Sequence, residues 1–156
     1  MSSKTRRSPY DTPPWRRAHT ATSPDGTRTA EIRDAREHSM SNPTVGTLHT
    51  SDGLRLADCN PAFIWSDDSR YLVIPQWIRC FGVFLRQRLV IVDVETKTVF
   101  ASRFSRLLMQ PRKLFEGRLE VTVSSSLGIS WERKEPLILD VPEALAKFTR
   151  LRDAYQ

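Results

Sequence analysis

The sequence contains no long apolar run among its 156 residues. Its most apolar region, residues 72–94, is interrupted by three arginines, whereas a membrane-spanning helix needs ~18 or more consecutive apolar residues. The first residues are rich in Ser, Lys, Arg and Pro and lack the apolar stretch of a secretory signal. We therefore expect a cytoplasmic protein without a membrane segment.

Cysteine is scarce as well, and the common motifs of metal binding and catalysis are missing. Cys59 and Cys80 have no CxxC partner, so we expect both to be reduced core residues. The histidines at positions 19, 38 and 49 have no partner at metal-ligand spacing. The six glycines form no phosphate-binding loop and no G-x-S-x-G turn. These shortages predict a protein that is not an enzyme and that needs no cofactor or metal.

Positive charge is concentrated at the N-terminus, and the rest of the chain is nearly balanced. Residues 1–17 hold five basic residues and one aspartate, a balance of +4 out of the net charge of +6. Three prolines interrupt this stretch. We expect a flexible basic leader over residues 1–17, followed by a single domain over residues 18–156. The two Arg pairs of the leader are weaker than the clustered runs of a typical nucleic-acid patch.

One short pattern occurs twice along the chain. The stretch "ATSPDGTRTAEI" (residues 21–32) has a relative in "FIWSDDSRYLVI" (residues 63–74), and the serines that open the two turns, Ser23 and Ser66, are 43 residues apart. In each copy a strand leads into a tight turn and a second strand leaves it. A unit repeated at this spacing indicates a repeat architecture. The chain is too short for a closed propeller of roughly four blades of ~40 residues.

Alternating segments predict strands over most of the chain. The strands are expected at 27–34, 44–50, 54–58, 70–77, 88–94 and 98–104, with a hairpin over 112–126 and one or two strands within 128–141. Pro75 cannot donate to a sheet, so its strand should bend or lie at an edge there. Near the C-terminus, Asp140 and Glu143 have capping-box spacing and apolar residues recur at helical intervals, which predicts a helix at about 142–154. The predicted fold is mainly all-β: twisted antiparallel meanders packed as an open sheet pair or sandwich, with a short C-terminal helix.

The repeated unit resembles the blades of TolB-like and WD-type β-propellers. Trp65, Ser66 and Asp68 match the aromatic-Ser-Pro-Asp-Gly turn of those blades, and "RLVIVDVETKT" matches their closing hairpin. The match covers residues 20–104 and contains two units, where a propeller has four or more. The resemblance implies a small scaffold of one to two blade-like units.

Residues 42–103 also look like the small cytosolic immunity proteins that bacteria encode beside polymorphic and type VI secretion toxins. This resemblance implies a monomer that binds one cognate toxin domain in a 1:1 complex and masks its active site. If the toxin is a nuclease, aspartates would stand in for phosphates of its substrate. The residues considered for this are Asp52, Asp58, Asp67 and Asp68.

Candidate partner-binding residues come from three segments. The segment "PQWIRCFGVFLRQR" (residues 75–88) mixes aromatic side chains with arginines, which are enriched in binding hot spots. The connection over residues 35–43 is long for a hairpin, and residues 66–69 form an acidic tight turn. The candidates are Trp77, Arg79, Phe81, Arg86, Arg88, Arg36, Glu37, His38, Asp67 and Asp68. The same pattern also fits core aromatics rimmed by arginines, and aspartates that only serve their turn.

Two functions from different classes remain open on the sequence. The first is a non-enzymatic inhibitor that binds a toxin protein, and it needs neither a membrane nor nucleic acid. The second is a nucleic-acid-associated β module that uses the basic leader. The second predicts binding that weakens steeply with salt and disappears when residues 1–17 are deleted.

Overall fold

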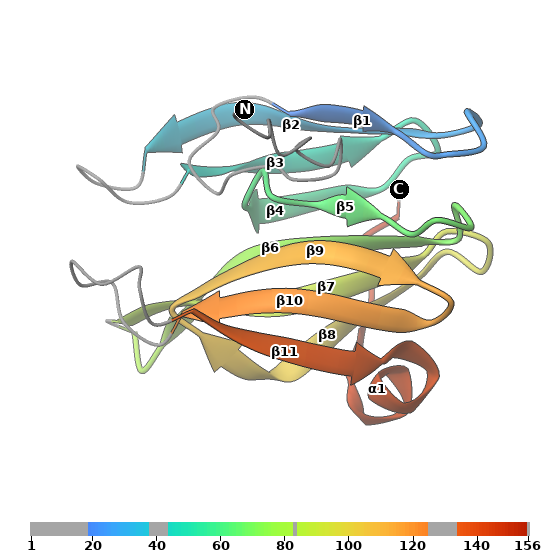
Figure 1. Ribbon diagram of the computed structural model, residues 1–156. Coiled ribbons are helices and arrows are strands. Elements are labelled where there is room, and N and C mark those ends of the chain that lie inside the picture. The colour runs from blue at the N-terminus through green and yellow to red at the C-terminus, as the bar shows by residue number, and fades with distance from the viewer. Residues whose placement is uncertain (1–18, 38–43, 83, 125–133, 156) are drawn as a thin grey trace, which may run out of the picture.

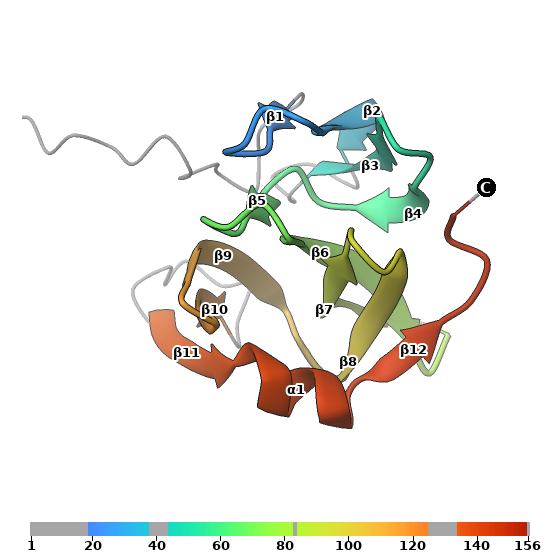
Figure 2. The same cartoon turned by 90° about the vertical axis from the view of Figure 1, so that its right-hand side faces the viewer.

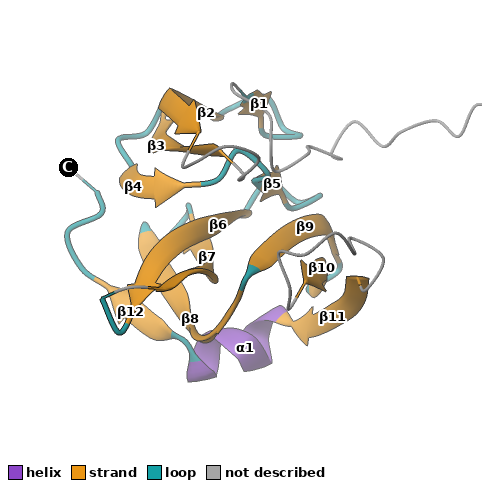
Figure 3. Cartoon of the chain, turned by 90° about the vertical axis from the view of Figure 1, so that its left-hand side faces the viewer, coloured by secondary structure: helices purple, strands orange, loops and turns teal. Residues whose placement is uncertain are grey.

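The computed structural model describes residues 19–37, 44–82, 84–124 and 134–155. The protein is mainly β, and the described part contains one short helix (Figure 3). No helix in these ranges is long and apolar enough to cross a membrane. The elements are β1 (Thr20–Thr22), β2 (Thr29–Glu37), β3 (Thr44–Thr50), β4 (Arg55–Cys59), β5 (Ile64–Trp65), β6 (Tyr71–Cys80), β7 (Phe84–Asp93), β8 (Thr98–Arg106), β9 (Leu108–Phe115), β10 (Arg118–Ser124), β11 (Lys134–Asp140), α1 (Val141–Lys147) and β12 (Thr149–Leu151).

Two open antiparallel sheets form the molecule. The larger sheet has the order β1-β2-β3-β4-β6-β7-β8-β12, with β5 paired to β6, and the smaller sheet has the order β11-β10-β9. The larger sheet curls so that β1–β4 form a layer over β6–β8, and the smaller sheet lies beside β6 and β7 (Figures 1 and 2). This is the sandwich-like packing of twisted meanders that the strand pattern predicts.

Strands β6 and β7 lie at the centre because both of their faces are buried. Alternate residues of a strand point to opposite faces. Leu72 and Ile74 pack into a first core with the β1–β4 layer, while Val73 packs into a second core with the smaller sheet. Neighbouring Leu89 and Val90 of β7 divide in the same way. Burial on both faces explains why these strands read as continuous apolar runs.

The two Ser-x-Asp turns have the same hydrogen bonds. Ser23 Oγ donates to Asp25 Oδ1 (2.7 Å), which also accepts the backbone N–H two residues further on (3.0 Å). Ser66 Oγ donates to Asp68 Oδ1 (2.6 Å), which likewise accepts the N–H two residues further on (3.1 Å). The turns also contact each other, because the Asp25 N–H donates to Ser69 Oγ (2.9 Å).

The first strand pair of each copy keeps the same interval of 43 residues. Thr22 lies opposite Thr29 in the β1–β2 pair, and Trp65 lies opposite Leu72 in the β5–β6 pair. Strands β1–β4 and β5–β8 are therefore two antiparallel meanders with matching first pairs. The echo in the sequence corresponds to matching turns and matching first strand pairs.

The C-terminal helix is shorter than the predicted span of 142–154. It begins as expected, with Asp140 Oδ1 accepting a backbone N–H of the first turn (3.0 Å), but it ends at Lys147. Phe148 is extended, and the next three residues form β12 against the outer edge of β8. Phe148 and Leu151 pack against different cores, the second and the first respectively. Pairing with the open edge of β8 satisfies backbone groups that a longer helix would have left exposed on β8.

Pro75 lies inside the larger sheet, not at its outer edge. On one side β6 pairs with β7 along its whole length. On the other side its partner changes from β5, at Val73, to β4, at Gln76. Pro75 occupies the gap between these two partners, where its carbonyl accepts the Asn60 N–H (2.8 Å). The missing N–H of proline thus falls where no strand requires a donor.

Candidate functional site

The two ends of the strands carry different side chains. We call the tight turns at residues 23–26, 66–69 and 93–97 the aspartate end. We call the last residues of β2, β4 and β6, together with the first residues of β7, the arginine end. In Figure 1 the aspartate end lies on the right and the arginine end on the left, and Figure 3 faces the arginine end. The ten residues of β6 separate the two ends by roughly 30 Å, at ~3.3 Å per residue.

A hollow of about 400 Å³ opens at the arginine end. Strands β2, β3, β4, β6 and β7 all contribute to it. The structure brings four of the ten predicted contact residues together here, although one of them comes from a distant segment of the chain. The residues that line this arginine hollow are Arg36, Val45, Asp58, Gln76, Trp77, Ile78, Arg79, Leu85 and Arg88.

Arg88 forms the most buried charged wall of the hollow. Its Nε donates to Gln76 Oε1 (2.8 Å), and Gln76 Nε2 in turn donates to the carbonyl of Ala57 (2.9 Å). Gln76 lies directly opposite Arg88 in the β6–β7 pair, so this chain of hydrogen bonds holds the guanidinium in one orientation. Burial lowers the pKa of Arg88 below its ordinary value, which means that its charge is partly dehydrated.

The hollow has an excess of positive charge. Arg36 and Arg79 are exposed, and within the described ranges neither forms an ion pair or a side-chain hydrogen bond. Asp58 is the one acidic residue among the lining side chains. Three arginines against one aspartate leave a balance of +2 around a small volume.

A β-bulge in β2 shapes the end of the strand that carries Arg36. The pairing of β2 with β3 shifts between Arg33 and Arg36, and Asp34 within this bulge has a φ of 55°. Gly46 of β3 lies against the bulge, where a Cβ atom would stand 2.5 Å from Ile32 Cγ2 and 2.8 Å from the Arg33 carbonyl oxygen. Bulges bend a strand and redirect its side chains. Gly46 is therefore the residue that lets β2 bend at this point.

Phe81 is exposed at the tip of the hairpin formed by β6 and β7, two strands that both contribute to the hollow. Its side chain is 96% exposed, and its φ is 54°, a left-handed conformation that aromatic residues rarely adopt. It follows Arg79 by two residues. A left-handed backbone is costly for an aromatic residue. The exposed ring leaves Phe81 open to contact with another molecule.

Trp77 is buried, which fits the alternative that the aromatic residues of this segment belong to the core. It is 6% exposed, and its Nε1 donates to the Thr44 carbonyl (3.3 Å). It therefore forms a wall of the hollow and offers little surface of its own. Arg86 is also engaged, because its Nε and Nη2 donate to the hydroxyl and the carbonyl of Ser105 (3.0 and 3.2 Å).

The remaining predicted residues divide between the two ends. Glu37 is exposed at the end of β2, beside Arg36, and His38 lies outside the described residues. Asp67 and Asp68 lie at the aspartate end, far from the hollow. Asp68 accepts the hydrogen bonds of its turn, and the Asp67 N–H donates to the carbonyl of Leu114 (3.1 Å).

The four aspartates considered as phosphate mimics are divided between the two ends of the strands. Asp58 lines the arginine hollow, whereas Asp67 and Asp68 belong to the turn before β6. Asp52 lies in the turn before β4, 3.7 Å from the Arg28 guanidinium. Strand geometry therefore places Asp58 at the opposite end of the molecule from Asp67 and Asp68, which sequence distance alone does not reveal.

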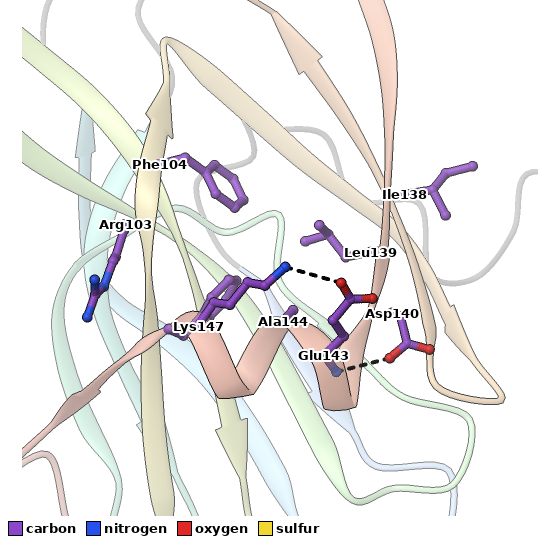
Figure 4. A pocket seen from close by; sticks show the side chains of 9 residues that line it. Arg103, Phe104, Ile138, Leu139, Asp140, Glu143, Ala144 and Lys147 are labelled. Carbon is purple, nitrogen blue, oxygen red and sulfur yellow. Dashed lines mark hydrogen bonds and ion pairs between the residues drawn. The ribbon is translucent and has the colours of Figure 1, made fainter.

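A second hollow, of about 300 Å³, lies between α1, β8 and β11 (Figure 4). Phe104, Leu139 and Ala144 give it an apolar lining. Three of its four charged lining residues are used by the fold, because Lys147 Nζ contacts Glu143 Oε1 (3.1 Å) and Asp140 caps the helix. Arg103 is the fourth. None of the predicted contact residues lies here.

Within the described ranges, no three His, Cys, Asp or Glu side chains gather closely enough to hold a metal ion. Comparisons of the chain with protein-family models, with curated proteins and with solved structures return no match.

Proposed function

We propose that the protein is a non-enzymatic binding protein that inhibits a partner protein by covering the partner's active site. The observation that carries this proposal is the arginine end, where three arginines without a carboxylate partner in the described ranges surround a hollow beside the fully exposed Phe81. Arginine and aromatic side chains dominate the binding energy of protein interfaces.

The scaffold suits such a role because it holds these side chains in place before binding. Both faces of β6 and β7 are buried up to the region of the hollow, and Gln76 fixes the Arg88 guanidinium. A preorganised surface loses little conformational entropy on binding. This favours tight recognition of one partner over loose contact with many.

The resemblance to immunity proteins specifies the partner within this proposal. The partner is the C-terminal toxin domain of a secreted bacterial effector, of the polymorphic or type VI class, bound 1:1 in the cytoplasm. Inhibition by coverage needs no chemistry from this chain. It requires only that the arginine end and Phe81 fit the rim or the mouth of the toxin's active site.

The test combines capture of the partner with measurement of its activity. The tagged full-length protein is used to capture proteins from a lysate of its source cell at ~0.5 M salt, where exposed charge pairs are screened within a few Å. The captured partner is then purified and its activity measured with added protein. The variant is Phe81→Asp. The matched control is Phe115→Asp, because Phe115 is 44% exposed on β9, outside the arginine end.

We expect stoichiometric inhibition by the wild type and by Phe115→Asp, and loss of inhibition with Phe81→Asp. A partner that keeps full activity in the complex would overturn the proposal. So would recovery of nucleic acid alone, lost as salt rises and on deletion of residues 1–17. That result would favour the nucleic-acid-associated module instead.

A further inference from the structure

We infer that the arginine hollow binds a side-chain carboxylate from an acidic segment of the partner protein, while Phe81 packs against an apolar side chain next to it. This inference rests on the proposed function, because it names the chemistry that the arginine end would recognise. It also makes a separate claim, since a partner could bind through Phe81 alone.

The first support is that most of the arginine N–H donors in the hollow have no acceptor within the described ranges. Arg88 uses its Nε for Gln76, and its two Nη atoms have no acceptor within the described ranges. Arg36 and Arg79 have none for any of their side-chain donors in the same ranges. A carboxylate accepts two parallel N–H donors from one guanidinium, and such charge-assisted hydrogen bonds are about twice as strong as neutral ones.

The second support is the environment of the Arg88 charge. The guanidinium is partly dehydrated and lies beside Trp77, Ile78 and Leu85. A charge in such a place has already lost part of its hydration, so that pairing with an anion costs less further desolvation and gains more than at an open surface. The Asp58 carboxylate is exposed, and no hydrogen bond or ion pair joins it to Arg88.

The third support is the mixed chemistry of the surroundings, which favours a protein segment over nucleic acid. Val45 and Leu85 form apolar walls, and Phe81 is exposed nearby. Nucleic acid binding needs a track of basic groups that neutralises several phosphates. Arg86 and Arg106, which would extend the hollow into a track, both donate to Ser105.

The experiment measures binding of a short labelled peptide of alternating Glu and Leu to the full-length protein at low salt, by fluorescence anisotropy. The comparison probes are the same peptide with Gln in place of Glu, a short single-stranded DNA, and inorganic phosphate as competitor. The variants are Arg88→Gln and the double variant Arg36→Gln/Arg79→Gln. The matched control is Arg150→Gln/Arg152→Gln, because both residues are exposed and the control removes the same charge as the double variant outside the hollow.

We expect saturable binding of the Glu peptide that weakens by roughly tenfold or more in each hollow variant, because a charge-assisted bidentate contact is lost. The control should retain wild-type affinity. The double variant changes only exposed side chains, so it keeps the test valid if Arg88→Gln lowers stability. Thermal unfolding of each variant identifies that case.

Four results would overturn the inference: no saturable binding of the Glu peptide, equal binding of the Gln peptide, equal weakening by the control variant, or displacement by DNA or phosphate at lower concentration than by unlabelled peptide.

The inference and the proposed function can fail separately. If Arg36→Gln/Arg79→Gln still inhibits a captured partner as well as the wild type, inhibition stands and the carboxylate contact is wrong. If the Glu peptide binds but no captured partner is inhibited, the contact stands and the function is wrong.

Discussion

The two ends of the molecule use charged side chains in opposite ways. At the aspartate end, the Asp25 and Asp68 carboxylates accept the hydrogen bonds of their turns, and Asp93 pairs with Arg70 (2.9 Å). At the arginine end, Arg36 and Arg79 have no such partner within the described ranges. Charge at the first end holds the strand connections together, whereas charge at the second end is available to another molecule.

Under the proposed function, this difference separates stability at one end of the strands from recognition at the other. Uncompensated charges of one sign repel each other and destabilise a compact state. The unpaired arginines at the arginine end therefore do not stabilise the isolated protein. We expect substitutions at the aspartate end to lower the free energy of unfolding, and substitutions of the exposed arginines to affect binding alone.

The largest expected effect is a loss of stability at the arginine end, where Gly46 is needed for the close packing of β2 and β3. Gly46→Val should lower the free energy of unfolding by about 3 kcal/mol, since a Cβ would overlap Ile32 and the Arg33 carbonyl across the bulge. Urea unfolding measures the loss. Gly26→Val, in open space at a φ of 74°, is the comparison for backbone strain without crowding. An unchanged midpoint for Gly46→Val would show that β2 does not need close contact with β3 there.

A second prediction sharpens the comparison by exchanging one charged residue at each end. Asp93 is buried, pairs with Arg70 and accepts the N–H groups of Glu95 and Thr96 (3.2 and 3.4 Å). Asp93→Ala should therefore lower the free energy of unfolding by roughly 2 kcal/mol. Arg79→Ala should change it by less than about 0.5 kcal/mol. Chemical denaturation of both variants checks the pair.

Binding should respond in the reverse order. Asp93→Ala should bind the Glu peptide as the wild type does, whereas Arg79→Ala should bind it more weakly. Equal destabilisation by both variants would mean that Arg79 is as much a part of the fold as Asp93. The separation between the two ends would then be wrong.

Local patterns predicted the aspartate end well and the arginine end only in part. A Ser-x-Asp turn is specified by neighbouring residues, so its geometry follows from a few letters of sequence. Arg79 and Arg88 were found because they share one segment with several aromatic residues. The helix was predicted too long because residues 148–151 have apolar spacing that also suits a strand, and only the open edge of β8 decides between the two.

The hollow itself depends on contacts between distant segments. Arg36 reaches it through the bulge in β2, and Asp58 through the pairing of β4 with β6, neither of which has a local signal. The contact between Gln76 and Arg88 could have been predicted from the sequence, because a hairpin centred on Gly82 places these two residues opposite each other. The burial of Trp77 and the hydrogen bonds from Arg86 to Ser105 depend on packing between distant segments, so composition does not indicate either of them.

The contribution of the aspartate end to the free energy of unfolding should depend on pH. The Ser23 hydroxyl and the Thr27 N–H and hydroxyl lower the pKa of Asp25 from 3.8 to about 2. Although burial opposes it, the hydrogen bonds from Arg70 and from the turn also hold the pKa of Asp93 below its ordinary value. A depressed pKa in the folded state stabilises the fold above the unfolded pKa, and this stabilisation disappears as pH falls through the folded value.

Between about pH 4 and pH 2, the wild type should therefore lose stability faster than Asp25→Asn. Urea unfolding at a series of pH values measures the two curves. The difference between them should be constant above pH 4 and should shrink towards pH 2. Parallel curves through this range would show that the Asp25 carboxylate has the same pKa in the folded and unfolded states.

The smallest expected effect concerns the two free thiols, which report on the arginine end without altering it. Burial raises the pKa of Cys59, so its thiol should stay protonated and unreactive until the protein unfolds. Cys80 is partly exposed at the end of β6, next to Phe81, and should react with a thiol reagent in the native protein. Because Cys80 adjoins the proposed contact surface, a bound partner or Glu peptide should slow its labelling by a few fold at saturation, while Cys59 stays unlabelled. A Cys80 labelling rate that is the same with and without saturating ligand would place the bound molecule away from the β6–β7 hairpin, and would separate recognition from the arginine end.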